Sequence, residues 1–595
     1  MKQTSLRIGC ASGFWGDTEN AAAQLVHGGN IDVLVFDYLA EITMSLLTRV
    51  KAKDPKGGYA PDFVSTLRPL LREIKTRGIR VVSNAGGVNP AACREALAQA
   101  AEAEGLDLKI AAVTGDDLLP QLNAIREAGV REMFSGAALP AKLASANAYL
   151  GAFPIAAALD AGADIVVTGR CVDSAVVLGP LIHAFGWKPD DYDRLAQGSL
   201  AGHIIECGTQ CTGGNYTDWH RVEGWENMGF PIADCAPDGS FVIEKPAGTG
   251  GLIDPSTVGE QVVYEIGDPS NYLLPDVSCD FSGIHLEAIG ENQVRVSGAR
   301  GRPATDQCKV SATYADGFRA TAQFMIGGID APAKAQRTGE ALLARCRRLF
   351  AERGLGDFTE TSVEALGSEA TYGPHARAET REVIVKVAAR HPDKNALEIF
   401  SREMAPMALA SAPAITGFSG GRPKVTPVIR LFSFVWPKAE IAVGLELDGQ
   451  SITCPQMRGA ATQPPPPPHA EPAALPADAF AAGTRTVPLV RLAWGRSGDK
   501  GDSANIGILA RRPEYLPFIR AALSADAVAQ WFAHLVQGPV HRYEWPGLDG
   551  LNFLLERALG GGGLASLRID PQGKAYAQML LDFPIPVPAT LELPS

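Results

Sequence analysis

The chain has 595 residues, of which 46% are hydrophobic and 20% are charged, and its formal net charge at pH 7 is -12. This composition is typical of globular domains and excludes disorder over most of the length, while the length requires at least two hydrophobic cores. The acidic balance offers no basic surface of the kind that a phosphate backbone requires, so we expect no nucleic-acid partner.

The beginning of the chain has no apolar run typical of a signal peptide, and no later stretch is long enough for a membrane span. We therefore expect a cytoplasmic protein without a membrane partner. The ten cysteines are widely dispersed, and a reducing compartment would keep them as thiols. Most of them are expected to be small residues of the core.

Short apolar runs alternate with amphipathic helices over the first 185 residues. Strands are predicted at 6–10, 31–36, 79–83, 108–114 and 164–168. A helix at 39–50 places Leu39, Ile42, Leu46 and Val50 on one face, and another runs from Pro61 to about residue 78. Strands that alternate with helices in this way predict an α/β domain with a mainly parallel sheet.

Polar residues and glycines follow these predicted strands at the ends where parallel sheets bind ligands. Asp37 follows the second strand, and other strands are followed by Asn84, Gly86, Gly87, Asp116, Asp117, Arg170 and Asp173. The alternative is that the glycines only turn the chain and the aspartates only cap helices. No dinucleotide fingerprint and no phosphate-binding P-loop motif follows any strand, and we expect no cofactor.

The densest chemical segment is 202–215, in which His203, Cys207 and Cys211 are spaced four apart. This spacing would suit a zinc site on a helix, but glycines interrupt the helix and no C-x-x-C pair is present, so we expect no metal. A thiol assisted by His203 is a second interpretation, and a buried Cys207 with a satisfied core histidine is a third. The turn at Gly213, Gly214 and Asn215 could present backbone amides to an anionic oxygen.

The pattern changes after residue 255 to alternating β-branched and polar residues, with strands predicted at 261–266, 293–296 and 309–314 and a helix at 334–352. We interpret 256–460 as an α+β lobe that continues the first domain, 1–255. Residues 461–483 contain five consecutive prolines, Pro464 to Pro468, and are predicted to be an extended surface linker.

The remaining residues, 484–595, are predicted to form a small α+β domain. Strands are expected at 486–493, 564–569 and 578–583, and helices at 514–523, 525–536 and 551–558. A turn-rich loop at 494–505 carries both signs of charge, and its candidate ligand-binding residues are Arg496, Ser497, Asp499 and Lys500. The four glycines at 560–563 suggest a close approach of the backbone to another group.

Several long strings of the sequence resemble the acyclic terpene utilization protein A (AtuA) family. In the first domain they are residues 8–17, 37–41, 83–87, 168–174 and 202–215, and beyond the linker residues 496–501 and 559–563 resemble the family's carboxy-terminal ferredoxin-like domain. The resemblance implies a bacterial catabolic setting, in which acyclic terpenes such as citronellol and geraniol are degraded through branched acyl-CoA thioesters. It assigns no catalytic residue, so the candidate residues rest on their placement.

Two functions are compatible with this pattern, and we favour the enzyme. The first is a cofactor-free lyase or hydratase acting on an acyl-CoA or related organic acid, with Asp37 or Asp173 as base and His203 with Cys207 as acid. Amides at Gly86, Gly87, Gly213 and Gly214 would stabilise an enolate, and the other candidate ligands are Asn84, Arg170, Asn215 and the four residues of the 494–505 loop. The alternative is a non-catalytic assembly or delivery subunit for a carboxylase or hydratase. We also expect a homo-oligomer.

Overall fold

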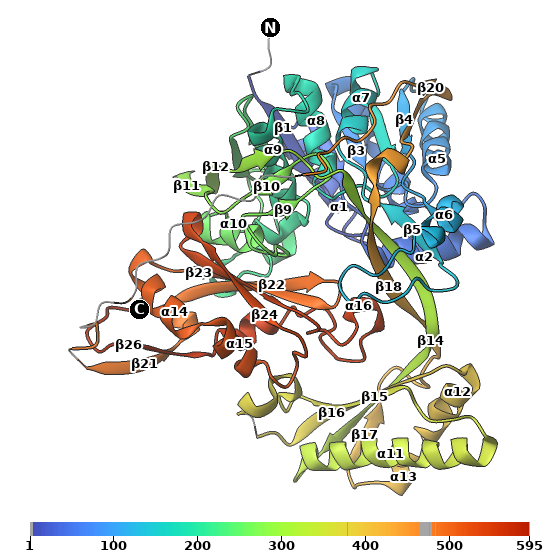
Figure 1. The fold of residues 1–595 in the computed structure, drawn as a ribbon, viewed down its shortest axis with the longest axis vertical. Helices are drawn as coiled ribbons and strands as arrows, with labels where there is room; N and C mark the ends of the chain where they lie inside the picture. The colour runs from blue at the N-terminus through green and yellow to red at the C-terminus, as the bar shows by residue number, and fades with distance from the viewer. Residues whose placement is uncertain (1–3, 378, 463–474, 476–478, 482, 594–595) are drawn as a thin grey trace.

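The computed structural model describes residues 4–377, 379–462, 475, 479–481 and 483–593 (Figure 1). The run of prolines from Pro464 to Pro468, and most of the predicted linker, lies outside the described residues. No helix in the described ranges is long and apolar enough to cross a membrane.

A mixed sheet forms the centre of the first domain, and the described residues contribute eleven strands to it in the order β11-β12-β8-β7-β1-β2-β3-β6-β4-β19-β20. Its middle is parallel and consists of β1 (Leu6–Cys10), β2 (Val33–Phe36), β3 (Arg80–Ser83), β6 (Ile165–Thr168) and β4 (Ile110–Thr114). Antiparallel strands extend both sides: β7 (Ile232–Cys235), β8 (Phe241–Glu244), β12 (Gln293–Ser297), β11 (His285–Gly290), β19 (Gly444–Leu447) and β20 (Gln450–Ile452). The predicted α/β class with a mainly parallel sheet is confirmed for the middle of this sheet.

Helices cover both faces of the parallel strands, which explains why those strands are apolar throughout. One face packs on α1 (Asn20–Gly28), α3 (Pro61–Leu67), α4 (Leu71–Arg77) and α5 (Pro90–Ala103). The other packs on α7 (Phe153–Asp160), α8 (Ala175–Phe185), α9 (Tyr192–Ile205) and α10 (Pro255–Val262), with α6 (Leu122–Glu127) at its margin. A small sheet, β9 (Tyr272–Leu273), β10 (Ser278–Asp280) and β13 (Arg300–Arg302), lies beside α9.

The helix α2 (Glu41–Lys53) differs from the expectation in the face that it buries. Ile42, Leu46 and Val50 are 47%, 43% and 42% exposed, whereas Met44 and Leu47 are buried. The prediction of a single apolar stripe was therefore wrong for three of its four residues. Two different faces of this helix carry apolar residues. The face with Met44 and Leu47 is the one that packs into the core.

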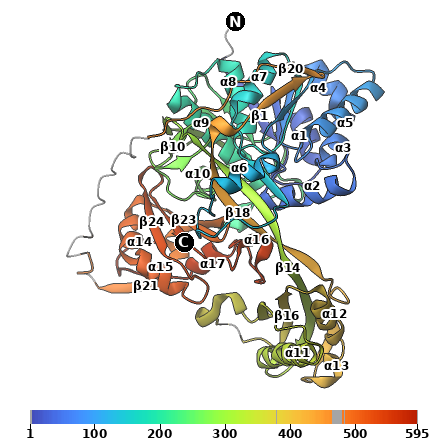
Figure 2. The same cartoon turned by 45° about the vertical axis from the view of Figure 1, so that its right-hand side comes forward.

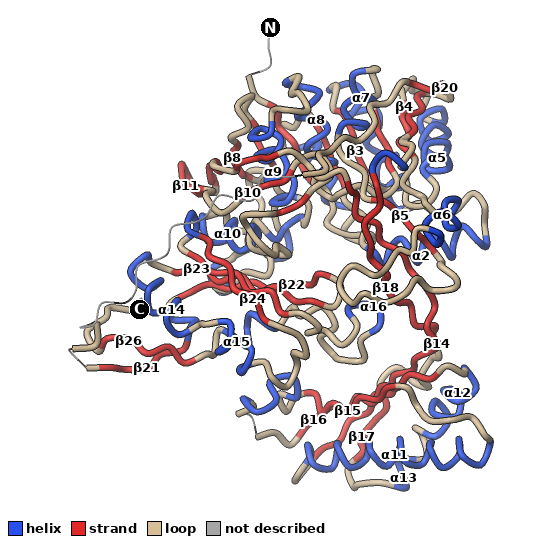
Figure 3. Tube along the Cα trace, viewed as in Figure 1, coloured by secondary structure: helices blue, strands red, loops and turns tan. Residues whose placement is uncertain are grey.

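A long strand, β14 (Gln307–Gly327), connects the first domain to a separate lobe, as Figure 1 and Figure 3 show. Its first half pairs with β5 (Ser145–Ala148) and β18 (Thr426–Pro437), and its second half pairs with β16 (Glu382–His391) and β17 (Ile415–Phe418). β15 (Glu360–Leu366), α11 (Ala331–Arg353), α12 (Lys394–Glu403) and α13 (Met407–Ala410) complete the lobe. The predicted lobe at 256–460 is thus divided, because β11, β12, β19 and β20 join the central sheet. The expected strand at 261–266 instead contains the end of α10.

The last domain is built on the antiparallel sheet β22 (Ala493–Lys500), β23 (Ser503–Ala510), β25 (Gly550–Leu555) and β24 (Val540–Trp545). Helices α14 (Leu516–Ala522), α15 (Ala525–Trp531), α16 (Gly562–Ala565) and α17 (Tyr576–Leu580) and the strand pair β21 (Thr484–Pro488) and β26 (Pro584–Pro588) complete it. The expected loop at 494–505 is a β-hairpin formed by β22 and β23. The expected helix at 551–558 instead contains most of β25. The expected strands at 564–569 and 578–583 overlap the ends of the helices α16 and α17. The segments expected as a helix or as strands are short, and their length and periodicity do not separate helix from strand.

Buried asparagines attach this domain to the turn that follows α10, and Figure 2 shows the two side by side. Asn505 donates to the Val263 carbonyl at 2.8 Å and accepts from the Glu265 amide at 2.8 Å. Asn552 donates to the Ile266 carbonyl at 2.7 Å. Both side chains are fully buried, so each would lose its hydrogen bonds without replacement by water if the domains separated.

The four glycines at 560–563 approach the backbone of the hairpin turn at 501–502. A Cβ atom on Gly562 would lie 2.4 Å from the Gly501 carbonyl oxygen, and the Gly561 amide donates to Asp502 at 2.7 Å. The expected close approach is therefore made within the same domain, and the glycines hold the tip of the hairpin in place.

Candidate functional site

Side chains at the carboxyl ends of β2 and β3 are joined by a hydrogen bond. The Asn84 side-chain amide donates to Asp37 Oδ1 at 2.5 Å, and Asn84 Oδ1 accepts from the Tyr38 amide at 2.8 Å. Both Asp37 and Asn84 are buried. Residues that directly follow two adjacent parallel strands meet at the same edge of the sheet, as the sequence predicts.

Three carboxyl groups converge at this edge, and we call Asp37, Asp173 and Glu206 the carboxylate cluster. Their oxygen atoms lie within 4.8 Å of one another. Asp173 follows β6, and Glu206 lies directly after α9. Gly202 permits this approach, because a Cβ atom there would lie 2.7 Å from the Cα atom of Ser174. The absence of a side chain at Gly202 therefore allows α9 to pack against the start of α8.

Arg170 supplies the buried positive charge of the cluster. Its guanidinium donates to Asp173 Oδ1 at 2.5 Å and to the Cys171 carbonyl at 2.8 Å. Its backbone amide donates to the buried Asp116 at 2.9 Å, and a Cβ atom on Gly169 would lie 2.2 Å from Asp116 Oδ1. The glycine that precedes Arg170 is thus required for the contact that fixes the arginine, and Asp173 is held as an ion pair.

Two members of the cluster favour the protonated state. Burial, followed by the negative charges of Asp173 and Glu206, raises the pKa of Asp37 well above its ordinary value. Burial, followed by the charges of Asp173 and Glu265, likewise raises the pKa of Glu206. Like charges this close together disfavour full ionisation, so burial and mutual repulsion both favour the protonated forms of Asp37 and Glu206. The ion-paired Asp173 lies beside these two carboxyl groups.

His203 is neutral and orients the Glu206 carboxyl group. Burial lowers the pKa of His203 to about 4. Its Nε2 lies 3.0 Å from the Val262 carbonyl oxygen, which can only accept, so the ring proton is on Nε2. Nδ1 then presents its lone pair to Glu206 Oε1 at 3.5 Å. The sequence predicts His203 with Cys207 as the acid, whereas this geometry places the Glu206 carboxyl group in that position with His203 as its orienting neighbour.

Tyr149, beside Arg170, contacts two cations. Arg170 lies 4.2 Å and Lys309 lies 4.8 Å from the ring centroid of Tyr149, whose hydroxyl donates to Glu41 at 2.6 Å. Lys309 Nζ is 3.7 Å from Glu41 Oε1. Burial alone would raise the pKa of Glu41, but Lys309 and Arg170 lower it to about 2. The ion pair of Lys309 and Glu41 is partly open to solvent, since their side chains are 37% and 31% exposed.

The last domain contributes charged side chains from the end of β22. Burial would lower the pKa of Lys500, but Tyr272, Glu265 and Asp173 outweigh it and raise that pKa above the ordinary value. Lys500 Nζ lies 5.4 Å from the ring centroid of Tyr272. Asp499 accepts from Lys574 at 3.3 Å, and burial and the charge of Glu265 raise its pKa to about 6. Asp499 and Lys500 thus bring the second domain to the carboxylate cluster.

Other predicted residues have structural partners. The amides of Gly87, Gly213 and Gly214 donate to the carbonyls of Asn84, Gln210 and Thr209 at 3.2, 3.3 and 2.8 Å. Gly86 packs closely, because a Cβ atom there would lie 2.5 Å from the Thr168 carbonyl oxygen. The Ser497 hydroxyl donates to the Gly573 carbonyl at 2.7 Å. The expected anion-binding amides of Gly87, Gly213 and Gly214 are therefore occupied. The predicted residues Gly213, Gly214, Asn215, Arg496 and Ser497 border the interdomain cavity described below.

The cysteines of the 202–215 segment do not assemble with His203. His203 lies in α9, Cys207 precedes the 3-10 turn Gly208–Gln210, and Cys211 follows it. Burial, together with the charge of Glu206, raises the pKa of Cys207 well above its ordinary value. A neutral thiol is a poor nucleophile, so this geometry favours the packing interpretation for Cys207. Among the described residues, the one group of acidic, histidine or cysteine side chains close enough to share an ion is the carboxylate cluster.

The sequence interpretation missed several residues of the site. Glu206 was counted among the acid and base groups of the dense segment but was not singled out as a site residue. Glu41 begins the helix after the second strand, where a charged residue at a carboxyl end is a usable signal. Tyr149 follows β5, and Lys309 lies in β14, more than a hundred residues from the other groups. No local pattern distinguishes Lys309 from a surface lysine, because only the pairing of β14 with β5 brings it to the site.

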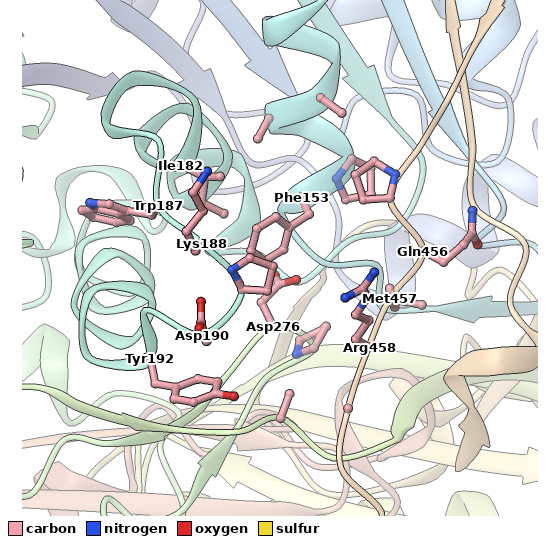
Figure 4. A pocket seen from close by; sticks show the side chains of 18 of the residues that line it. Phe153, Ile182, Trp187, Lys188, Asp190, Tyr192, Asp276, Gln456, Met457 and Arg458 are labelled. Atoms are coloured by element: carbon pink, nitrogen blue, oxygen red, sulfur yellow. The ribbon is translucent and has the colours of Figure 1, made fainter. Parts of the chain in front are cut away.

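Cavities of about 810, 630 and 530 Å³ lie elsewhere among the described residues, and two of them bear on the site. The larger, about 810 Å³, is bordered by α7, the end of α8 and residues 455–460 (Figure 4). Asp276, one of its polar groups, already accepts from the Ala152 amide at 2.7 Å. None of the predicted site residues borders this cavity. The second, about 630 Å³, lies between the 209–217 segment and β22, and we call it the interdomain cavity.

The fold and this site define an α/β protein with an additional lobe and a smaller last domain, in which buried and ion-paired carboxyl groups gather at one edge of the parallel strands. The model of the acyclic terpene utilisation family protein AtuA matches residues 6–447, and that of the AtuA ferredoxin-like domain matches residues 487–586. The chain therefore belongs to the AtuA family, and the resemblance in sequence is confirmed. Comparisons with curated proteins and with solved structures gave no match.

Proposed function

We propose that the carboxylate cluster is the active centre of a hydratase or lyase that acts on an unsaturated or hydroxylated acyl thioester, in the utilisation of acyclic terpenes for which the family is described. The observation that supports this proposal most directly is the pairing of a charged Asp173 with carboxyl groups that favour the protonated state at Asp37 and Glu206. Neighbouring carboxyl groups in different protonation states are what general acid–base catalysis requires.

In the proposed addition, the Asp173 carboxylate removes a proton from water, and the water oxygen forms a bond to the β-carbon of the thioester. The π electrons move toward the carbonyl and give an enolate, whose oxygen is stabilised by Lys500 and Lys309. The Glu206 carboxyl group then donates its proton to the α-carbon. Elimination is the reverse, and exchange with solvent returns both carboxyl groups to their starting states.

The cations support a carbonyl or anionic substrate. Arg170, Lys309 and Lys500 surround the cluster, and each affects the proton equilibrium of at least one neighbouring acid. A cation held in a largely buried site stabilises a developing oxyanion more strongly than one in water does. A strongly perturbed group of acids and bases supports an enzyme over the alternative of a non-catalytic assembly subunit.

The proposal is tested with two aspartates at opposite ends of the same strand. Asp173 follows β6, while Asp164 precedes it and forms ion pairs with Lys75 and Arg80 at 2.9 and 2.6 Å. A panel of enoyl and 3-hydroxyacyl thioesters is assayed with the full chain. Asp173→Asn should lose about a hundredfold or more of the turnover, as expected for a lost base, and Asp164→Asn should retain it. Equal activity of both variants and the parent would contradict the proposal.

A further inference from the structure

We propose that the interdomain cavity binds an adenine nucleotide, so that the substrate of the carboxylate cluster carries a nucleotide handle. The inference rests on the proposed function for the identity of the substrate, but the cavity itself can be tested for nucleotide binding alone. Its volume of about 630 Å³ lies within the usual range for small-molecule sites.

Two exposed tryptophans border the cavity. Trp219 and Trp225 are 61% and 60% exposed, and both rings belong to short 3-10 turns of the first domain. Their centroids are 6.0 Å apart with an interplanar angle of 65°. Large indole surfaces are rarely left in water without a use, and a planar base stacks on such a face. The pair therefore favours a ligand with an aromatic ring.

A guanidinium without an acidic partner borders the same cavity. Arg496 donates to the Asn215 carbonyl at 2.8 Å and to the Gln210 side chain, both of which are neutral. Its Nε is buried and has no partner, and no carboxylate oxygen of the described residues lies within 4.0 Å of the group. The charge of Arg496 acts on the proton equilibrium of Glu260. Burial nevertheless raises the pKa of Glu260 to about 8, so this acid is mainly neutral at pH 7. The guanidinium also lies 4.9 Å from the ring centroid of Tyr264. Neither the aromatic ring nor the neutral hydrogen-bond partners cancel its charge, which can therefore attract a phosphate.

Lys574 provides a second cation, which is partly neutralised. Its Nζ is 3.3 Å from Asp499 Oδ1 and 3.6 Å from Glu265 Oε1. Hydroxyl and amide side chains complete the lining and suit the hydrogen bonds of a ribose and a base edge: Thr209, Gln210, Asn215, Thr217 and Gln578. Stacking surface, an uncompensated arginine and neutral polar groups together match a nucleotide better than a hydrocarbon chain.

The cavity and the carboxylate cluster are connected by a shared segment of the chain and by Lys574. Glu206 belongs to the cluster, and the same segment borders the cavity from Thr209 onward. Lys574 borders the cavity and pairs with Glu265, whose charge in turn raises the pKa of Glu206. A nucleotide held by the tryptophans would therefore direct an attached acyl group toward the acids and bases of the first domain.

Calorimetric titration of the full chain with ADP, adenosine and inorganic pyrophosphate tests the inference. ADP should bind, and adenosine and pyrophosphate should each bind more weakly. Trp219→Leu and Trp225→Leu should each weaken ADP binding by about fivefold or more, since stacking of one base contributes at least this much. Arg496→Met should weaken ADP but not adenosine. Phe134→Leu, which alters an equally exposed aromatic residue outside the cavity, should change neither.

The outcomes separate this inference from the proposed function. If ADP does not bind at millimolar concentration, or binds equally well to both tryptophan variants, the nucleotide site is wrong. A change of oligomeric state in those variants without a change in ADP binding would overturn it as well, because the indoles would then cover a second copy. If ADP binds as expected while no thioester is turned over, the nucleotide site stands and the hydratase proposal fails. Asp173→Asn should keep ADP binding.

Discussion

Replacement of Glu206 by glutamine tests whether this buried carboxyl group holds a proton in the folded chain. Its pKa is raised, so the folded chain binds the proton more tightly than the unfolded chain. The stability that this provides is full below the ordinary carboxyl pKa of about 4.3 and is lost as the pH rises toward the raised pKa. In that window the free energy of unfolding of the parent falls by about 1.4 kcal/mol for each pH unit. Glutamine mimics the protonated acid, so the variant does not lose this stability.

The expected result is a growing advantage of Glu206→Gln over the parent as the pH increases from 5 to 8. For a chain of 595 residues, the usual unfolding entropy per residue converts this slope into a difference in Tm of about 1 °C per pH unit. Thermal melting followed by circular dichroism, at four pH values and matched ionic strength, measures it. If the difference in Tm stays constant or shrinks with pH, Glu206 is ionised in the folded chain and the assignment of the acid is refuted.

Three further predictions concern the thiol, the domain contact and metal ions. Cys207→Ala should retain turnover within about threefold, because the neutral thiol has no catalytic role; a hundredfold loss in a folded variant would restore the thiol interpretation. Asp218→Asn should lower the Tm by about 2–3 °C, since Asp218 pairs with Arg511 at 2.6 Å through both oxygens in a poorly exposed contact, while Asp193→Asn at an exposed pair should leave it within about 1 °C. Incubation with EDTA should leave turnover unchanged; loss that Mg²⁺ restores would mean that the carboxylate cluster ligates a metal.

The parallel part of the fold follows from the sequence because its signals are local. Alternating apolar runs and helices identify β1, β2, β3, β4 and β6 within one or two residues. The last domain is different. Residues 551–558 combine the apolar residues Leu551, Phe553, Leu554 and Leu555 with the polar residues Asn552, Glu556 and Arg557. Only packing decides that Leu551, Phe553 and Leu555 face one core as a strand while Asn552 turns to the other domain. Periodicity alone does not contain this information.

The candidate site likewise contains residues that the sequence predicts and residues that it does not. Asp37 and Asn84 are predictable because each directly follows a parallel strand, and Asp173 because it lies in the loop after β6; such residues share one edge of the sheet. Lys309 and Lys500 reach the site through the pairing of β14 with β5 and through the docking of the last domain. Those contacts are made between distant segments. The raised pKa values of Asp37 and Glu206 could not be predicted from the sequence either, since they depend on burial and on the distances between the carboxyl groups.

The central claim is that the carboxylate cluster transfers protons to and from the α-carbon of an acyl thioester. Hydration of an enoyl thioester by the full chain in D₂O, followed by mass spectrometry, tests it most directly. We expect one deuterium at the α-carbon of the 3-hydroxyacyl product with the parent chain, and at least a hundredfold slower incorporation with Glu206→Gln or Asp173→Asn. Incorporation at the parent rate in both variants, or none by the parent across the thioester panel, would contradict the claim.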